Sequence, residues 1–266
     1  MWSSIVCQPV PESAQPFVPE QSGLCRHSLV WMRPNCRAAV AAQVKDDATH
    51  TQVAAWLAAD RPLVVARQPG GAVLPDTVTP GTISVTSGTI SVTPGTISAG
   101  TISTGLALPP APDKRRIALV VAAHEIARYT QPLLLADAIA HATAAWQPAL
   151  AELHDAAINI GIKLRVFGSL AWQALSGLQY LTPHSDIDLL WNPLSHAQLQ
   201  QGIALLARWE QEHGLRADGE VLFGANSAVS WREWAALKPG GDQRVLVKRE
   251  SGAELVAARE LLELLA

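Results

Sequence analysis

Two short stretches of this chain combine residue types that could hold a metal ion and a phosphate group. Residues 166–169 predict a strand that ends in a turn of small residues, Gly168 and Ser169. Further along, Asp186 and Asp188 alternate with apolar residues, as in a second strand. Side chains alternate along a strand, so both carboxylates would share one face and repel each other unless a cation lay between them. Carboxylate oxygens suit Mg²⁺ (or Mn²⁺), and the pattern therefore predicts metal-assisted phosphoryl or nucleotidyl transfer.

Each of the two motifs also has a purely structural interpretation. In a phosphate site, Gly168 would let the backbone approach the ligand closely, and a helix starting at Ser169 would offer free N–H groups to the phosphate. An ordinary tight turn between a strand and a helix would use the same two residues. Asp186 could simply cap a strand at the surface. The apolar residues after Asp188 predict a buried strand, however, and carboxylates at the start of such a strand need compensation.

A site for phosphoryl transfer often uses a third carboxylate and a few cations. Glu220 and Asp218 share one face of the next predicted strand; Glu220 is the first choice, because Asp218 with the following glycine also predicts a turn. Lys248 ends an apolar run that would direct it into the site as a phosphate ligand, although a solvated surface charge is the alternative. Trp172 could stack on a base or fill the core, and we expect the core.

Composition limits the classes of partner. The chain has 266 residues, is 48% hydrophobic and 16% charged, and carries a formal net charge of −3, so we expect a folded core and no nucleic acid. Three irregularly spaced cysteines predict neither a disulfide framework nor a zinc site, and they favour the cytoplasm. We also expect no signal peptide and no membrane-spanning helix.

The predicted fold class is α+β, a mixed β-sheet flanked by helices and preceded by a small α+β domain. The tract Gly-Thr-Ile-Ser begins at Gly81, Gly88, Gly95 and Gly100, with unequal spacing, and we expect a low-complexity loop that is dispensable for chemistry. Further along, we expect Pro148 to break a helical stretch, and we predict a helix over 195–213 and a terminal helix over 254–264. The expected parts are a loose leader (1–24), the small domain (25–78), the repeat loop and linker (79–112) and the main domain (113–266).

Gly-Ser followed by Asp-x-Asp resembles the nucleotidyltransferase superfamily related to DNA polymerase β. Within it, the chain most resembles the malonate decarboxylase holo-acyl-carrier-protein synthase family, which are phosphoribosyl-dephospho-coenzyme A transferases. The central residues 166–173, 175–181 and 185–191 carry this resemblance, and 26–31, 61–67, 114–119, 218–220 and 229–233 add weaker matches. The gap between Ser169 and Asp186 is longer than in most of the superfamily but fits this family.

The resemblance implies a defined reaction. The phosphoribosyl-dephospho-coenzyme A group would pass from its triphosphate precursor to a serine of the malonate decarboxylase acyl carrier protein, with release of diphosphate. Asp186 and Asp188 would hold Mg²⁺, Gly168 and Ser169 would bind phosphates, and Asp188 or the third carboxylate would act as base. The alternatives are another nucleotidyltransferase, acting on a small molecule or RNA, and a non-catalytic nucleotide-binding module.

Overall fold

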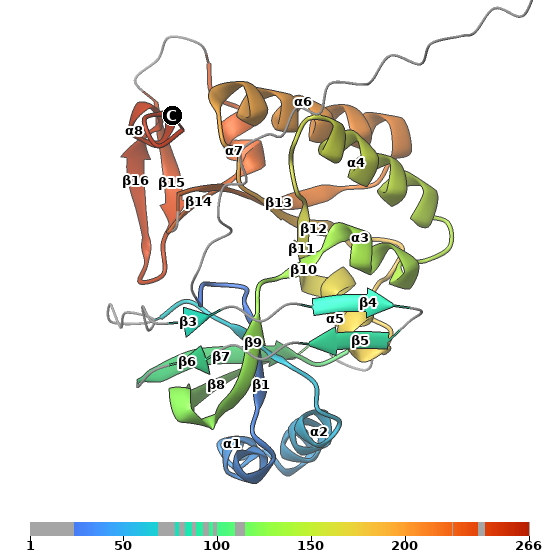
Figure 1. Cartoon of the computed structure of the whole chain (residues 1–266), viewed down its shortest axis with the longest axis vertical. Helices are drawn as coiled ribbons and strands as arrows, with labels where there is room; N and C mark the ends of the chain where they lie inside the picture. Colours follow the sequence, from blue (N-terminus) through green and yellow to red (C-terminus); the bar gives the residue numbers. More distant parts are fainter. Residues whose placement is uncertain are drawn as a thin grey trace, which may run out of the picture.

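The computed structural model describes residues 24–68, 100–109, 115–224, 226–238 and 243–265, together with the short strands 78–79, 83–86, 89–92 and 96–97. Two main β-sheets with helices between and around them make up most of the described chain (Figure 1). This arrangement confirms the predicted α+β class. Most of the leader lies outside the described residues. None of the described helices is both long and apolar enough to cross a membrane.

The first sheet has five antiparallel strands in the order β8-β7-β2-β1-β9. Its strands are β1 (Leu29–Met32), β2 (Leu63–Val65), β7 (Thr101–Ala107), β8 (Arg116–Ala122) and β9 (Ile126–Thr130). Helices α1 (Arg37–Ala41) and α2 (Asp47–Ala58) connect β1 to β2 and lie at one end of the molecule (Figure 1). Asp46 begins α2 by accepting a hydrogen bond from the backbone N–H of Thr49 at 2.9 Å.

The second sheet has seven strands in the order β10 to β16, and only the β12–β13 pair is parallel. Its strands are β10 (Leu133–Leu134), β11 (Arg165–Phe167), β12 (Ile187–Trp191), β13 (Ala217–Phe223), β14 (Ser227–Ser230), β15 (Arg244–Lys248) and β16 (Ala253–Ala257). Its helices are α3 (Leu135–Ala138), α4 (Gln147–Asn159), α5 (Gly168–Ser176), α6 (His196–His213), α7 (Trp231–Ala235) and α8 (Ala258–Leu262).

Helix α6 connects the two parallel strands, and its ends follow local rules. Ser195, the first residue of the predicted helix over 195–213, caps the start by accepting a hydrogen bond from the N–H of Gln198 at 3.2 Å. Gly214 ends the helix in a left-handed conformation. The helical stretch over 136–160 is interrupted at residues 142–146, and Pro148 follows this break in the first turn of α4, where its missing N–H has no partner to lose.

One predicted domain boundary and two predicted elements are wrong. A main domain starting at residue 113 would separate β8 from β7, yet these two strands pair along their whole length in the first sheet. The second sheet therefore begins after β9. The last repeat copy, at Gly100, does not lie in a loop, since Thr101 starts β7, between β8 and β2. The terminal helix over 254–264 is a strand, β16, in its first part, because residues 253–257 pair with β15.

The other described repeat segments form two small antiparallel pairs. Strand β3 (Val78–Thr79) pairs with β6 (Thr96–Ile97), and β4 (Ile83–Thr86) pairs with β5 (Thr89–Val92). Neither pair is part of the two main sheets. The remaining residues of 69–99 lie outside the described part of the chain.

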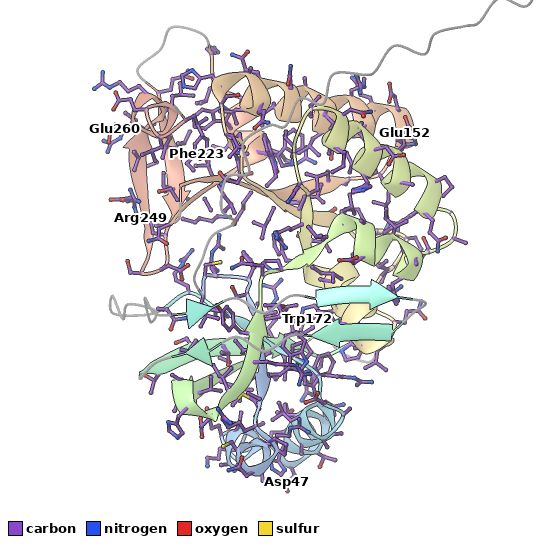
Figure 2. The ribbon with its side chains drawn as sticks, viewed as in Figure 1. Asp47, Glu152, Trp172, Phe223, Arg249 and Glu260 are labelled. Carbon is purple, nitrogen blue, oxygen red and sulfur yellow. The ribbon has the colours of Figure 1, made fainter. Side chains whose placement is uncertain are left out.

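Helix α5 connects the two sheets through its side chains. Trp172 lies between them in Figure 2 and packs into the core of the first sheet, with its ring 5.4 Å from that of Trp56. This confirms that Trp172 is a core residue. Gln173 accepts hydrogen bonds from the N–H groups of Tyr180 and Leu181 and so fixes the loop after α5. The Tyr180 hydroxyl then donates to the backbone oxygen of Ala107 in the first sheet, at 2.7 Å.

Candidate active site

The turn between β11 and α5 is built around a glycine that touches a carboxylate. Gly168 has a φ of +64°, which a residue with a side chain adopts only at a cost. A Cβ atom at Gly168 would lie 1.8 Å from Oδ2 of Asp188 and 2.7 Å from its Cγ. The Asp188 carboxylate therefore rests against the start of α5, and only glycine fits there. This contact joins the two motifs that the sequence singles out.

The N-terminus of α5 is the natural place for a phosphate next to this carboxylate. Phe167 precedes the helix and has no polar side chain that could cap it. The first N–H groups of a helix have no partner within it, and the helix dipole favours an anion there. Ser169 is buried in the first turn, with 9% of its surface exposed. The predicted phosphate ligands Gly168 and Ser169 thus lie together beside Asp188.

Strand register fixes which residues share the face of the sheet with Asp188. Asp188 pairs with Phe167 on one side and with Asp218 on the other. Paired residues of neighbouring strands point to the same face, whereas Ile187 and Leu189 point into the core and are fully buried. Asp218 is therefore the carboxylate across from Asp188, and its Oδ1 accepts the N–H of Gly219 at 2.8 Å.

Asp186 lies just before β12 and is more accessible. Its Oδ1 is 3.6 Å from Nε of Arg216, and the two side chains are 33% and 63% exposed. An ion pair so exposed to water contributes little to stability and exchanges easily. A metal ion could replace Arg216 at this carboxylate without breaking a buried interaction.

Glu220 lies in a different environment from the other carboxylates. It is buried, with 4% of its surface exposed, and it forms ion pairs with Nη2 of Arg26 and with Nζ of Lys248, the latter at 2.8 Å. Burial alone would raise its pKa, but the nearby His27 ring, the charge of Arg26 and the hydrogen bond from Lys248 outweigh that effect and hold the pKa of Glu220 well below its usual range. Glu220 is therefore ionised and already neutralised by protein cations.

His27 completes this cluster. Its ring lies 4.2 Å from the ring of Phe167, and its Nε2 lies 3.6 Å from Oε2 of Glu220, beyond hydrogen-bond distance. Burial lowers the pKa of His27, and the positive charge of Arg26 adds to this effect, so the ring is neutral near pH 7. Neither Arg26 nor His27 is among the site residues predicted from the sequence, because no local pattern reveals contacts with residues so distant in the chain.

The acidic residues predicted to hold a metal do not form one closed set. In the described part of the chain, the single group of three His, Cys, Asp or Glu ligand atoms within 4.8 Å of one another is Glu152, Glu212 and His213, on α4 and α6. Asp186, Asp188 and Glu220 are not such a group. Asp186 and Asp188 would offer two hard oxygen donors, and Mg²⁺ usually binds one or two carboxylates and keeps several waters.

Two family models match the chain. The model described as the phosphoribosyl-dephospho-CoA transferase MdcG N-terminal domain covers residues 25–75, and that of the C-terminal domain covers residues 134–259. A curated phosphoribosyl-dephospho-CoA transferase of Xanthomonas campestris pv. campestris (strain 8004) is 38% identical over 231 residues, which are 87% of this chain and 93% of the relative. The chain belongs to the phosphoribosyl-dephospho-CoA transferase family. It is therefore an enzyme of the transferase class.

Other relatives carry the same name. That of Xanthomonas axonopodis pv. citri (strain 306) is 38% identical over 87% of this chain and 93% of its own length. That of Bradyrhizobium diazoefficiens (strain JCM 10833 / BCRC 13528 / IAM 13628 / NBRC 14792 / USDA 110) is 38% identical over 55% of this chain and 63% of its own. No solved structure matches this chain at a significant level. Arg26 and His27 lie in the match to the transferase family's N-terminal domain, whereas Gly168, Asp188 and Glu220 lie in the match to its C-terminal domain.

Proposed function

We propose that this enzyme attaches the phosphoribosyl-dephospho-coenzyme A group to the acyl carrier protein of malonate decarboxylase. The donor is 2′-(5″-triphosphoribosyl)-3′-dephospho-coenzyme A. A serine hydroxyl of the carrier attacks the α-phosphorus, the bond from that phosphorus to the bridging oxygen of the β-phosphate breaks, and diphosphate leaves. The serine proton passes to a base, and the product is a phosphodiester. Membership of the transferase family supports the transferred group, and the contact of Asp188 with Gly168 is the observation that carries the site.

Asp186 and Asp188 are the proposed holders of Mg²⁺ or Mn²⁺. A bound divalent ion would supply charge stabilisation for the phosphoryl oxygens and the leaving diphosphate. Asp218 is the better third carboxylate than Glu220, because it pairs with Asp188 across β12 and β13. Glu220 lies two residues further along β13, and its charge is already neutralised by Arg26 and Lys248.

The chain's own groups would bind and orient the substrate. The N–H groups at the start of α5 would donate hydrogen bonds to the triphosphate, and Ser169 lies in that first turn. Lys248 is a proposed phosphate ligand whose Nζ lies on the same face of the sheet, with its side chain 34% exposed. Asp188, or the third carboxylate, would take the proton from the carrier serine.

The compartment and the partner follow from this chemistry. The carrier protein subunit is the macromolecular partner, and no nucleic acid is involved. We expect the reaction in the cytoplasm, where thiols stay reduced; Cys25 and Cys36 are both free.

Mass spectrometry of the carrier protein tests the proposal. The intact enzyme, the apo-carrier, Mg²⁺ and the triphosphoribosyl precursor are incubated together, and diphosphate is measured in parallel. We expect one mole of diphosphate per modified serine and no mass gain with a serine-to-alanine carrier. An unmodified carrier, with nucleotidyl transfer to a small molecule or RNA instead, would establish the rival enzyme activity. Substrate binding without any transfer would indicate a nucleotide-binding module.

A further inference from the structure

One buried carboxylate holds two cations that come from different parts of the chain. Oε2 of Glu220 pairs with Nη2 of Arg26, and Oε1 accepts a hydrogen bond from Nζ of Lys248 at 2.8 Å. Arg26 precedes β1 of the first sheet, whereas Lys248 ends β15 of the second. Two cations, Arg26 and Lys248, therefore share the carboxylate of Glu220, and a second carboxylate, that of Glu250, accepts the backbone N–H of Arg26.

Arg26 is fixed at both its main chain and its side chain. Its backbone N–H donates to Oε1 of Glu250 at 2.9 Å, just after β15. The backbone oxygen of Glu250 accepts the N–H of Gln68 at 2.8 Å. Glu250 therefore binds two segments that flank strands of the first sheet, one at Arg26 and one at Gln68. A guanidinium has five N–H donors in a rigid fork, and the bond to Glu220 uses only part of that capacity. Arg26 is therefore pre-organised and still has donors for a ligand.

The cluster lies on the same face of the sheet as the proposed reaction centre. Glu220 is two residues along β13 from Asp218, the partner of Asp188, which corresponds to about 7 Å. The ring of His27 packs on Phe167, the residue before Gly168. The side chains of Arg26 and Lys248 are 17% and 34% exposed, so both reach the surface beside this face.

We propose that Arg26 and Lys248 together bind the terminal phosphates of the triphosphate substrate, and that Glu220 is a positioning residue for these two cations rather than a metal ligand. This inference rests on the proposed transfer reaction and names the groups that hold its leaving diphosphate. The ligand class is a polyphosphate, because its several negative charges match two cations held side by side. The N-terminal domain would thus complete the active site of the C-terminal domain.

Binding of inorganic tripolyphosphate by calorimetry tests this without the carrier or any turnover. Three variants of the full-length chain are compared with the wild type: Arg26→Met, Glu220→Gln and the matched control Arg37→Met. Arg37 and Arg128 both pair with Asp60, so this cluster also has two cations on one carboxylate. All three residues lie in the first sheet, in its helices or next to them, so the cluster does not connect the two sheets. Mn²⁺ affinity is measured on the same samples, and far-UV circular dichroism checks their folding.

We expect Arg26→Met to weaken tripolyphosphate binding about ten- to a hundred-fold, as loss of a charge-assisted hydrogen bond does. Glu220→Gln should also weaken it, because Arg26 and Lys248 lose the carboxylate that holds them side by side. Mn²⁺ affinity should stay unchanged in both, and Arg37→Met should match the wild type. Loss of Mn²⁺ affinity in Glu220→Gln, or wild-type tripolyphosphate affinity in Arg26→Met, would overturn the proposal. If Arg26→Met does not fold, Arg26→Lys replaces it. We expect Arg26→Lys to lose less tripolyphosphate affinity than Arg26→Met, and wild-type affinity in Arg26→Lys would contradict the proposal. Wild-type enzyme that binds tripolyphosphate but does not modify the carrier would refute the proposed reaction and leave this site standing.

Discussion

Replacing Gly168 with alanine should inactivate the enzyme while it stays folded. The new Cβ would lie 1.8 Å from Oδ2 and 3.2 Å from Cβ of Asp188, so the carboxylate would have to withdraw to at least the ordinary contact distance of 3.4 Å. The three nearest atoms all belong to the Asp188 side chain, and that side chain must therefore give way. A displacement of about 1 Å at a reacting centre can cost about a hundred-fold in rate. The left-handed backbone adds a strain of roughly 1–2 kcal/mol to the folded state.

The chain contains a control that separates these two effects. Gly177 ends the same helix with a φ of +69°, and a Cβ there would meet no atom within 4 Å. Gly177→Ala therefore carries the same backbone strain as Gly168→Ala without a clash. Urea unfolding should show a comparable loss of stability in both variants, whereas the rate of carrier modification should fall about a hundred-fold only in Gly168→Ala.

The comparison between the variants has a clear negative outcome. Equal transfer rates in Gly168→Ala and Gly177→Ala would show that the position of Asp188 does not matter for the reaction. In that case the contact between the two motifs would be a packing feature, and the proposed reaction centre would have to lie elsewhere.

Three further predictions follow from the same structure. Asp188→Asn should fold normally and lower the transfer rate about a thousand-fold or more, since a metal carboxylate contributes several kcal/mol to the transition state; near wild-type turnover would refute this role. Deleting residues 80–97 should spare activity. Deleting residues 79–104 should unfold the first sheet, because this deletion removes the start of β7, and circular dichroism can show the loss. Burial lowers the pKa of His27 below 6.5, so the unfolded state binds the proton first as the pH falls. The free energy of unfolding should thus decrease below about pH 6.5, by up to about 1.4 kcal/mol per pH unit, and less in His27→Gln; equal slopes in urea titrations would contradict this.

The sequence predicts elements well where local chemistry decides them. The Ser195 cap and the apolar periodicity after it locate α6, and alternation of apolar residues locates β12. Strand β16 is missed because its residues also have a helix-compatible pattern, and pairing with β15 overrides it. Strand β7 is missed for the same reason. Its repeat sequence predicts a loop, but pairing with β2 and β8 makes it a strand.

The candidate site shows the same division between local and long-range signals. Gly168, Asp186 and Asp188 can be found from sequence because residue type and spacing limit what such residues do. The contact of Gly168 with Asp188 and the pairing of Arg26 with Glu220 depend on tertiary structure; the latter pair is 194 positions apart. Glu220 therefore looks like a metal ligand in the sequence, yet the structure surrounds it with cations. One carboxylate on a strand can serve either purpose, and only its neighbours decide which.

The first residues of β7 limit where the repeat tract can change in length. Gly100 and the three residues after it are the last of four Gly-Thr-Ile-Ser copies, and the first three copies start seven residues apart. Gly100 starts five residues after the copy at Gly95 and so departs from this spacing. Pairing with β2 and β8 fixes the final copy. A change in the number of copies before Gly100 would therefore leave the five strands of the first sheet in place, whereas a change within β7 would not.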